Sequence, residues 1–120
     1  MARILIVDDS RISRRILRNI LEQGGHEIVG EAGNGQEGYE LFLELRPDLV
    51  TMDITMPVMD GLESLRLIIE EDPKAKVLMI TAAGQKDKMM QAVRLGCIDF
   101  VAKPFDDRMV VDMVTRHTGG

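Results

Sequence analysis

Three acidic residues and one lysine each stand directly after a short run of apolar residues. They are Asp8, Asp9, Asp53 and Lys103, and the runs that precede them cover residues 3–7, 48–52 and 98–102. If these runs are strands of one open parallel sheet, their carboxyl ends share one edge, and ligands bind at that edge. The spacing therefore predicts that three carboxylates and one ammonium group lie close together.

Metal binding combined with phosphoryl transfer is the chemistry that fits such a cluster. Like charges a few ångströms apart repel by about 1 kcal/mol in water and about 4 kcal/mol at an effective dielectric constant of about 20. A cation would relieve this repulsion, and an all-oxygen ligand set suits Mg²⁺. The Asp53 carboxylate can also act as a nucleophile that accepts a phosphoryl group, and Lys103 can pair with the anion. Helix capping by Asp8 or Asp9 is the alternative, but capping needs only one aspartate.

A hydroxyl and a set of small residues follow a further apolar run at residues 76–81. Thr81 ends this run, and Ala82, Ala83 and Gly84 come next. We expect the Thr81 hydroxyl to face the same edge of the sheet. The small residues leave room for a phosphoryl group and let backbone N–H groups approach it.

The elements that must position these groups alternate along the whole chain. Strands are predicted over 3–7, 26–31, 48–53, 76–81 and 98–102. Helices are predicted between them, with an apolar stripe at 12, 16, 17, 20 and 21 in the first, apolar residues over 39–45 and 62–69 in the next two, and helical segments over 85–95 and 106–117. Five strand–helix units predict an α/β fold with a doubly wound parallel sheet. A barrel of eight units would need roughly 250 residues.

Composition limits the classes of protein to be considered. The 120 residues predict one domain over 1–120, and the net charge of −5 argues against direct binding of nucleic acid. Cys97 is the only cysteine, so no internal disulfide can form and a reducing compartment is expected. Neither a membrane span nor a signal peptide is predicted. These features predict a cytoplasmic protein with no membrane association.

Together the motifs resemble the receiver domains of two-component response regulators, most closely those of the chemotaxis type. The resemblance rests on Asp8-Asp9, on Asp53 with Met56-Pro57 and Asp60-Gly61, on Thr81-Ala82, and on Lys103-Pro104-Phe105. It covers essentially the whole chain, with the elements in order at successive strand ends. It implies a flavodoxin-like (βα)5 fold with strand order 2-1-3-4-5.

The resemblance also implies a role for each residue of the cluster. Asp53 is the expected phosphoacceptor, taking its phosphoryl group from a phosphohistidine on a histidine kinase. Asp9, Asp53 and the backbone carbonyl of Thr55 are expected to bind Mg²⁺, with Asp8 positioning water on the metal. Lys103 is expected to pair with a phosphoryl oxygen, and the Lys103–Pro104 peptide bond is expected to be cis.

Two further residues are implied to carry the signal. Thr81 is expected to move so that its hydroxyl bonds the phosphoryl group, and Phe100 is expected to rotate inward into the space that Thr81 leaves. Phe100 lacks the hydroxyl of the tyrosine often found at this position. The chain is thus expected to be a regulatory switch that promotes its own phosphorylation and dephosphorylation, rather than a conventional enzyme.

The implied partners are proteins. Besides the kinase they include a downstream target, for which the flagellar motor switch is one candidate, and a phosphatase; the chain itself is expected to be a monomer. Four arginines, Arg11, Arg14, Arg15 and Arg18, form a basic stripe on the first predicted helix. This stripe is interpreted either as a solvated helix face or as a dock for the kinase or phosphatase.

Two other functions compete with this interpretation. The first is the receiver half of a larger regulator with a DNA-binding or enzymatic output domain. The second is a phosphatase of the haloacid dehalogenase type, which also uses an aspartate nucleophile and Mg²⁺, but which resembles Asp-x-Asp where this chain has Asp53-Ile54-Thr55. A nucleotide-binding relative of flavodoxin is disfavoured because no phosphate-binding loop follows the first strand.

Overall fold

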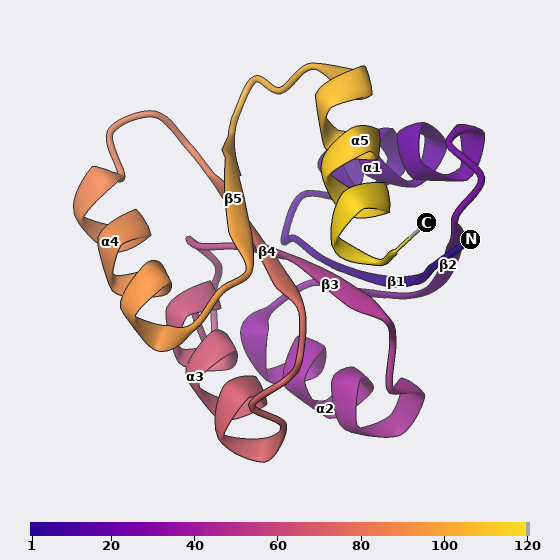
Figure 1. Ribbon diagram of the computed structural model, residues 1–120. Coiled ribbons are helices and arrows are strands. Elements are labelled where there is room, and N and C mark those ends of the chain that lie inside the picture. Colours follow the sequence, from indigo (N-terminus) through magenta and orange to yellow (C-terminus); the bar gives the residue numbers. More distant parts are fainter. Residues whose placement is uncertain (120) are drawn as a thin grey trace.

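Among the described residues five parallel strands form one sheet; four helices connect them, and a fifth follows the last strand (Figure 1). The computed structural model describes residues 1–119, so Gly120 of the predicted domain lies outside the described residues. The strands are β1 (Arg3–Val7), β2 (Glu27–Ala32), β3 (Leu49–Asp53), β4 (Val77–Thr81) and β5 (Asp99–Ala102). The helices are α1 (Arg11–Gln23), α2 (Gly35–Leu45), α3 (Gly61–Glu71), α4 (Lys86–Leu95) and α5 (Asp107–His117). The strand order is β2-β1-β3-β4-β5, which confirms the predicted fold.

Helices cover both faces of the sheet, with α1 and α5 on one face and α2, α3 and α4 on the other (Figure 1). Successive residues of a strand point to opposite faces. In β1, Leu5 and Val7 accordingly pack toward α2 to α4, whereas Ile4 and Ile6 pack toward α1 and α5. This double burial explains why the strands are continuous apolar runs rather than alternating ones.

The first two turns of α1 are less buried than the predicted apolar stripe requires. Leu17, Ile20 and Leu21 are buried, but Ile12 is 73% exposed and Ile16 is 48% exposed. The prediction was therefore wrong for these two isoleucines. A groove of about 500 Å³ lies between Ile16 and Phe105, in the loop after β5, so this loop leaves Ile16 uncovered.

Four of the five helices begin with a residue whose side chain accepts a hydrogen bond from the backbone N–H three residues further on. These residues are Ser10, Asn34, Asp60 and Asp106. Such a cap typically contributes about 1 kcal/mol. Helix α4 differs, because the side chain of Gln85 at its start makes no capping hydrogen bond.

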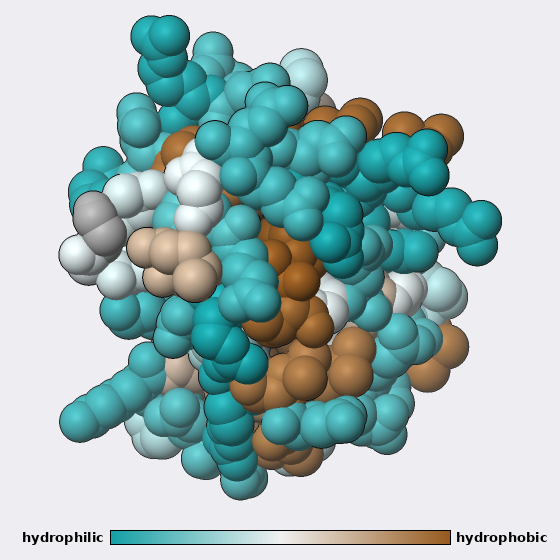
Figure 2. Space-filling model, turned by 90° about the vertical axis from the view of Figure 1, so that its right-hand side faces the viewer, coloured by the Kyte–Doolittle hydropathy of each residue, from teal (hydrophilic) through white to brown (hydrophobic). Residues whose placement is uncertain are grey.

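The strand β2 is one edge of the sheet, and most of its residues are partly exposed. Figure 2 views the side of the molecule on which β2 lies and shows mainly hydrophilic residues, with a band of hydrophobic residues between them. Among the described residues no helix is both long enough and apolar enough to cross a membrane.

His26 precedes β2 and links the N-terminal residues to α5, although the sequence predicts it as the first residue of that strand. Its Nδ1 accepts a hydrogen bond from the backbone N–H of Ala2 at 3.1 Å, and its Nε2 lies 3.0 Å from the hydroxyl of Thr115 on α5. Because Nδ1 accepts, the ring is neutral and Nε2 carries the hydrogen. Burial lowers the pKa of His26, and the N-terminal ammonium group lowers it further.

The lowered pKa predicts a loss of stability in mild acid. Unfolded histidine binds a proton below a pH of about 6.5, whereas folded His26 resists protonation. Its contribution to the free energy of unfolding is therefore fully present above that pH and is lost as the pH falls through the lower, folded pKa. Urea unfolding between pH 7.5 and 5.5 measures the slope, and His26→Gln should flatten it. Equal slopes for the two proteins would contradict the prediction.

Thr51 in the middle of β3 is buried without a hydrogen-bond partner for its hydroxyl among the described residues. Its neighbours in register are Ile6 on β1 and Leu78 on β4. An unsatisfied buried polar group costs about 1–3 kcal/mol. We expect Thr51→Val, which keeps the shape and removes the hydroxyl, to raise the free energy of unfolding by about 1 kcal/mol. Urea denaturation would show it, and a loss of stability would indicate that the hydroxyl has a partner in solution.

Candidate functional site

The acidic cluster lies at the carboxyl edge of the sheet, where the chain leaves β1 in one direction and β3 in the other. Asp8 directly follows β1, Asp53 is the last residue of β3, and Lys103 directly follows β5. Strand β1 is paired with both β2 and β3, so the connections diverge at this point. Open parallel sheets bind their ligands at such a divergence.

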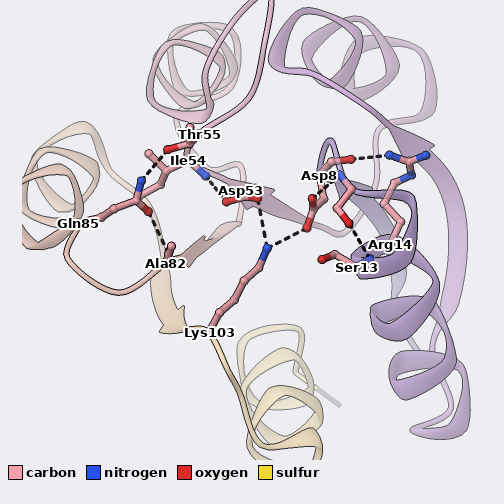
Figure 3. Close-up of polar contacts among 10 residues, drawn as sticks. Asp8, Ser13, Arg14, Asp53, Ile54, Thr55, Ala82, Gln85 and Lys103 are labelled. Carbon is pink, nitrogen blue, oxygen red and sulfur yellow. Dashed lines mark hydrogen bonds and ion pairs between the residues drawn. The ribbon is translucent and has the colours of Figure 1, made fainter.

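Lys103 joins the two strand-end aspartates (Figure 3). Its Nζ lies 3.3 Å from Oδ2 of Asp8 and 3.3 Å from Oδ2 of Asp53. The peptide bond between Lys103 and Pro104 is cis, as the resemblance implied. The structure thus brings together the lysine and two of the carboxylates that the sequence predicts.

Asp9 completes a set of three carboxylates that can hold a cation. One carboxylate oxygen from each of Asp8, Asp9 and Asp53 lies within 4.8 Å of the other two. All three donors are hard oxygen atoms, and Asp9 is exposed, so water can complete the coordination of an ion. This donor set fits Mg²⁺, which takes few carboxylates and keeps several waters.

The charges of the cluster act on one another because they are partly removed from water. Asp53 exposes only 9% of its surface. Burial raises the pKa of its carboxyl, the Lys103 ammonium opposes that rise, and the Asp8 carboxylate adds to it. Burial acts to lower the pKa of Lys103, but Asp53 and Asp8 outweigh burial and raise it. The ion pairs therefore hold two crowded carboxylates in place, and a cation would stabilise them further.

Backbone groups fix the remaining carboxylate oxygens. Oδ1 of Asp8 accepts from the N–H of Ser10, and Oδ1 of Asp53 accepts from the N–H of Ile54, each at 2.8 Å. On each aspartate one oxygen is bound by the loop that follows its strand, and the other faces Lys103. Each carboxylate is held in one orientation before any ligand arrives.

Arg14 of α1 holds the loop that carries Asp8, a role that the sequence does not predict. Its guanidinium donates to the backbone carbonyl of Asp8 at 2.6 Å (Figure 3). It also donates to the carboxylate of Glu31 on β2 at 3.2 Å. Arg18 also pairs with Glu31, at 2.7 Å. Of the four arginines of the predicted basic stripe, Arg11 and Arg15 are exposed and make no ion pair among the described residues, whereas Arg14 and Arg18 do. Helical spacing indicates that the four arginines share a face but not that Glu31 lies beside two of them.

Thr81 and Phe100, the two residues predicted to carry the signal, lie on neighbouring strands: Thr81 ends β4 and Phe100 is in β5. Thr81 is buried, and its hydroxyl donates to the sulfur of Met89 on α4 at 3.3 Å rather than to Asp53. Phe100 is 38% exposed. Met89 is a hydrogen-bond partner that spacing along the sequence does not reveal.

Thr55 and Ala82 lie on the two loops that flank Asp53, and Gln85 joins them (Figure 3). The sequence predicts only that Gln85 begins a helix. No signal in the sequence pairs it with Thr55, which is thirty positions away.

Gly61 allows α3 to begin directly beside the backbone of Asp53. Its N–H donates to the carbonyl of Ile54 at 2.7 Å, and a Cβ at this position would lie 2.0 Å from the carbonyl oxygen of Asp53. Two backbones cannot yield as a flexible side chain can, so the added methyl must displace one of them.

We therefore expect Gly61→Ala to lower the free energy of unfolding by at least about 2 kcal/mol. Urea denaturation measures the loss. Gly33→Ala is the matched control, because its Cβ would meet only the guanidinium of Arg14 at an ordinary 3.8 Å. If Gly61→Ala were as stable as this control, the close approach of α3 to Asp53 would be wrong.

The geometry of the site agrees with the family to which the sequence is matched. The family described as "Response regulator receiver domain" matches residues 4–115. The chain belongs to this family. Receiver domains bind Mg²⁺ in an acidic pocket, and this chain has an acidic cluster of Asp8, Asp9 and Asp53 that could hold such an ion. Membership of the receiver-domain family argues against the alternative of a phosphatase of the haloacid dehalogenase type.

Similar proteins include chemotaxis regulators. The receiver domain is 48% identical to Protein CcdB of Bacillus subtilis, over 99% of both chains. It is 43% identical to the chemotaxis protein CheY of Thermotoga maritima, over 95% of both chains. Among solved structures it is similar to the CheX–CheY–BeF3–Mg²⁺ complex from Borrelia burgdorferi, with 35% identity, a TM-score of 0.90, and coverage of 95% of this chain and 87% of that one. The chain is thus a CheY-like receiver domain, a regulatory switch.

Proposed function

We propose that residues 1–120 form one receiver domain in which Asp53 accepts a phosphoryl group from a histidine kinase. The observation that carries this proposal is the arrangement of Asp53, whose Oδ2 faces Lys103 beside two further carboxylates. The Asp53 oxygen attacks the phosphorus of a phosphohistidine, a P–O bond forms, and the P–N bond breaks with its electron pair leaving on the histidine nitrogen. Most of the rate enhancement then comes from positioning and charge neutralisation.

The residues of the site divide this work. Asp8, Asp9, Asp53 and the backbone carbonyl of Thr55 would hold Mg²⁺, whose positive charge offsets the negative charge of the phosphoryl group. The Lys103 ammonium group exchanges its contact with Asp53 Oδ2 for a contact with a phosphoryl oxygen, and it keeps its ion pair with Asp8. The small residues after Thr81 leave space for the group, and backbone N–H groups of that loop donate to it.

The signal passes to Thr81 and Phe100. In the structure the Thr81 hydroxyl is held by Met89 and Phe100 is 38% exposed. A phosphoryl oxygen offers the hydroxyl a charged acceptor, which makes a stronger hydrogen bond than a thioether sulfur. Thr81 then turns toward Asp53, and Phe100 moves into the vacated space. Phosphorylation thereby shifts the population between two arrangements of β4 and β5.

Two exposed apolar surfaces fit protein partners. The first lies beside Lys103, where Ile16, Pro104 and Phe105 line the groove next to α1; we propose that helices of the kinase or of a phosphatase dock there. The second carries the output to a target protein of a chemotaxis system and comprises exposed residues of α4, β5 and α5, namely Met90, Val93, Phe100 and Met109. The lone thiol of Cys97 supports a cytoplasmic location, and we propose a monomer.

Intact mass spectrometry tests the proposal directly. Incubation with acetyl phosphate and Mg²⁺ should add one phosphate to the protein, and removal of Mg²⁺ with EDTA should prevent the addition. Treatment with mild alkali should remove the group rapidly, because an acyl phosphate hydrolyses at this pH whereas a phosphoserine persists. No adduct with acetyl phosphate and Mg²⁺, with folding confirmed by circular dichroism, would overturn the proposal.

A further inference from the structure

Gln85 connects the two loops that flank the phosphorylation site (Figure 3). Its Oε1 accepts a hydrogen bond from the backbone N–H of Ala82 at 2.9 Å, and its Nε2 donates to the hydroxyl oxygen of Thr55 at 2.6 Å. The Ala82 N–H can only donate, so the orientation of the amide follows from chemistry. Both ends of one side chain are therefore used to hold the loop after β4 against the loop after β3.

The start of α4 shows that this arrangement replaces the usual one. The other four helices each begin with a side chain that caps the helix. Gln85 occupies the same position in α4 and makes no cap, because its amide reaches away from the helix to the two loops. Helix α4 therefore lacks a side-chain cap, and the amide of Gln85 links the two loops instead.

The Gln85 bridge uses a backbone N–H, that of Ala82, which a phosphoryl group on Asp53 would also use as a hydrogen-bond donor. Ala82 follows Thr81 directly, and its N–H belongs to the small-residue loop beside Asp53. A charged phosphoryl oxygen is a stronger acceptor than an amide oxygen. One N–H cannot serve both acceptors with good geometry, so the Gln85 amide and the phosphoryl oxygen compete for it.

We propose that Gln85 is a positioning residue that restrains the site in its unphosphorylated form. It holds the Ala82 N–H and the Thr55 hydroxyl while Asp53 is free, and it releases the Ala82 N–H when a phosphoryl group arrives. This inference rests on the proposed function, because the competing ligand is the group on Asp53. It assigns to Gln85 a share in setting how readily the switch is turned on.

Replacing Gln85 should therefore favour the phosphorylated form. Gln85→Ala removes the competitor, and a net hydrogen bond at a solvent-exposed position corresponds to a change of about two- to tenfold in an equilibrium constant. Gln85→Glu keeps an acceptor for Ala82, and Thr55 can turn its hydroxyl to donate to the new carboxylate. The glutamate variant should thus keep the restraint that the alanine variant loses.

Amide hydrogen exchange followed by NMR tests the restraint without any phosphoryl group. In the Mg²⁺-free protein the Ala82 amide should exchange slowly in the parent and in Gln85→Glu, and several-fold faster in Gln85→Ala. Gln91→Ala, which removes an exposed glutamine further along α4, is the matched control and should leave the Ala82 amide unchanged. Equal exchange rates of the Ala82 amide in the parent and the three variants would overturn the proposal that Gln85 restrains this loop.

Titration with beryllium fluoride in the presence of Mg²⁺ tests the competition, because this ion stands in for a phosphoryl group on a carboxylate. We expect Gln85→Ala to bind it about two- to tenfold more tightly than the parent, with Gln91→Ala equal to the parent and Gln85→Glu no tighter. Weaker or equal binding by Gln85→Ala would show that the bridge does not oppose the phosphoryl group. No binding by any variant, including the parent, would instead contradict the proposed function.

Discussion

Asp53→Asn is expected to abolish the phosphate adduct that acetyl phosphate and Mg²⁺ produce on the parent. The side-chain amide has the shape of the carboxylate but lacks the anionic oxygen that attacks phosphorus. Intact mass spectrometry should detect no added phosphate under conditions that modify the parent. Asp112→Asn, at an exposed position of α5, is the matched control and should be modified as the parent is.

The fold should survive this substitution, which separates loss of the acceptor from loss of structure. The pKa of Asp53 is raised, chiefly by burial, so its ionised form costs stability at neutral pH. Removing that charge in the absence of Mg²⁺ should leave the free energy of unfolding unchanged or higher, with Lys103 still paired with Asp8. An adduct that persists in Asp53→Asn would assign the acceptor to another residue.

Lys103→Met is expected to slow the phosphorylation of Asp53 by about 100- to 1,000-fold, the usual cost of removing one preorganised donor from a site of developing negative charge. The methionine keeps much of the length of the lysine side chain but offers no charge to the phosphoryl oxygens. The rate of adduct formation, followed by mass spectrometry at fixed acetyl phosphate and Mg²⁺, gives the ratio. Lys88→Met, an exposed lysine of α4, controls for loss of a charge.

The same variant should depend on Mg²⁺ for its stability more than the parent does. Without Lys103, the carboxylates of Asp8 and Asp53 lose the counter-ion that lies 3.3 Å from each. Breaking a partly buried ion pair leaves charge uncompensated, and Mg²⁺ can restore the compensation. The rise in melting temperature on adding Mg²⁺ should be larger for Lys103→Met than for the parent. A parent-like rate together with a parent-like response to Mg²⁺ would remove Lys103 from both roles.

The Gln85 bridge and the Lys103 ion pairs restrain the site in different ways. Lys103 supplies charge that the phosphoryl group uses, so its loss should slow the reaction. Gln85 holds an N–H that the phosphoryl group also uses, so its loss should strengthen binding of the group. The two roles are therefore distinguished by opposite effects: loss of Lys103 should weaken the interaction with the phosphoryl group, and loss of Gln85 should strengthen it.

Much of the fold and most of the site were predictable from the sequence because they depend on local patterns. A buried parallel strand is a continuous apolar run, and the residue that ends it must lie at the carboxyl edge of the sheet. Asp8, Asp53 and Lys103 could therefore be placed together before the structure was known. Helix spacing predicted Leu17, Ile20 and Leu21 as core residues of α1, and all three are buried.

Only the tertiary structure decided which side chains meet across different elements. The exposure of Ile16 depends on where the loop after β5 passes, and the pairing of Arg14 depends on Glu31 of a neighbouring strand. The bridge from Gln85 to Thr55 forms because β3 and β4 are adjacent in the sheet, which brings their following loops side by side. Periodicity reports which face of its own element a residue occupies, whereas these contacts depend on how separate elements pack, and that geometry is set by the whole fold.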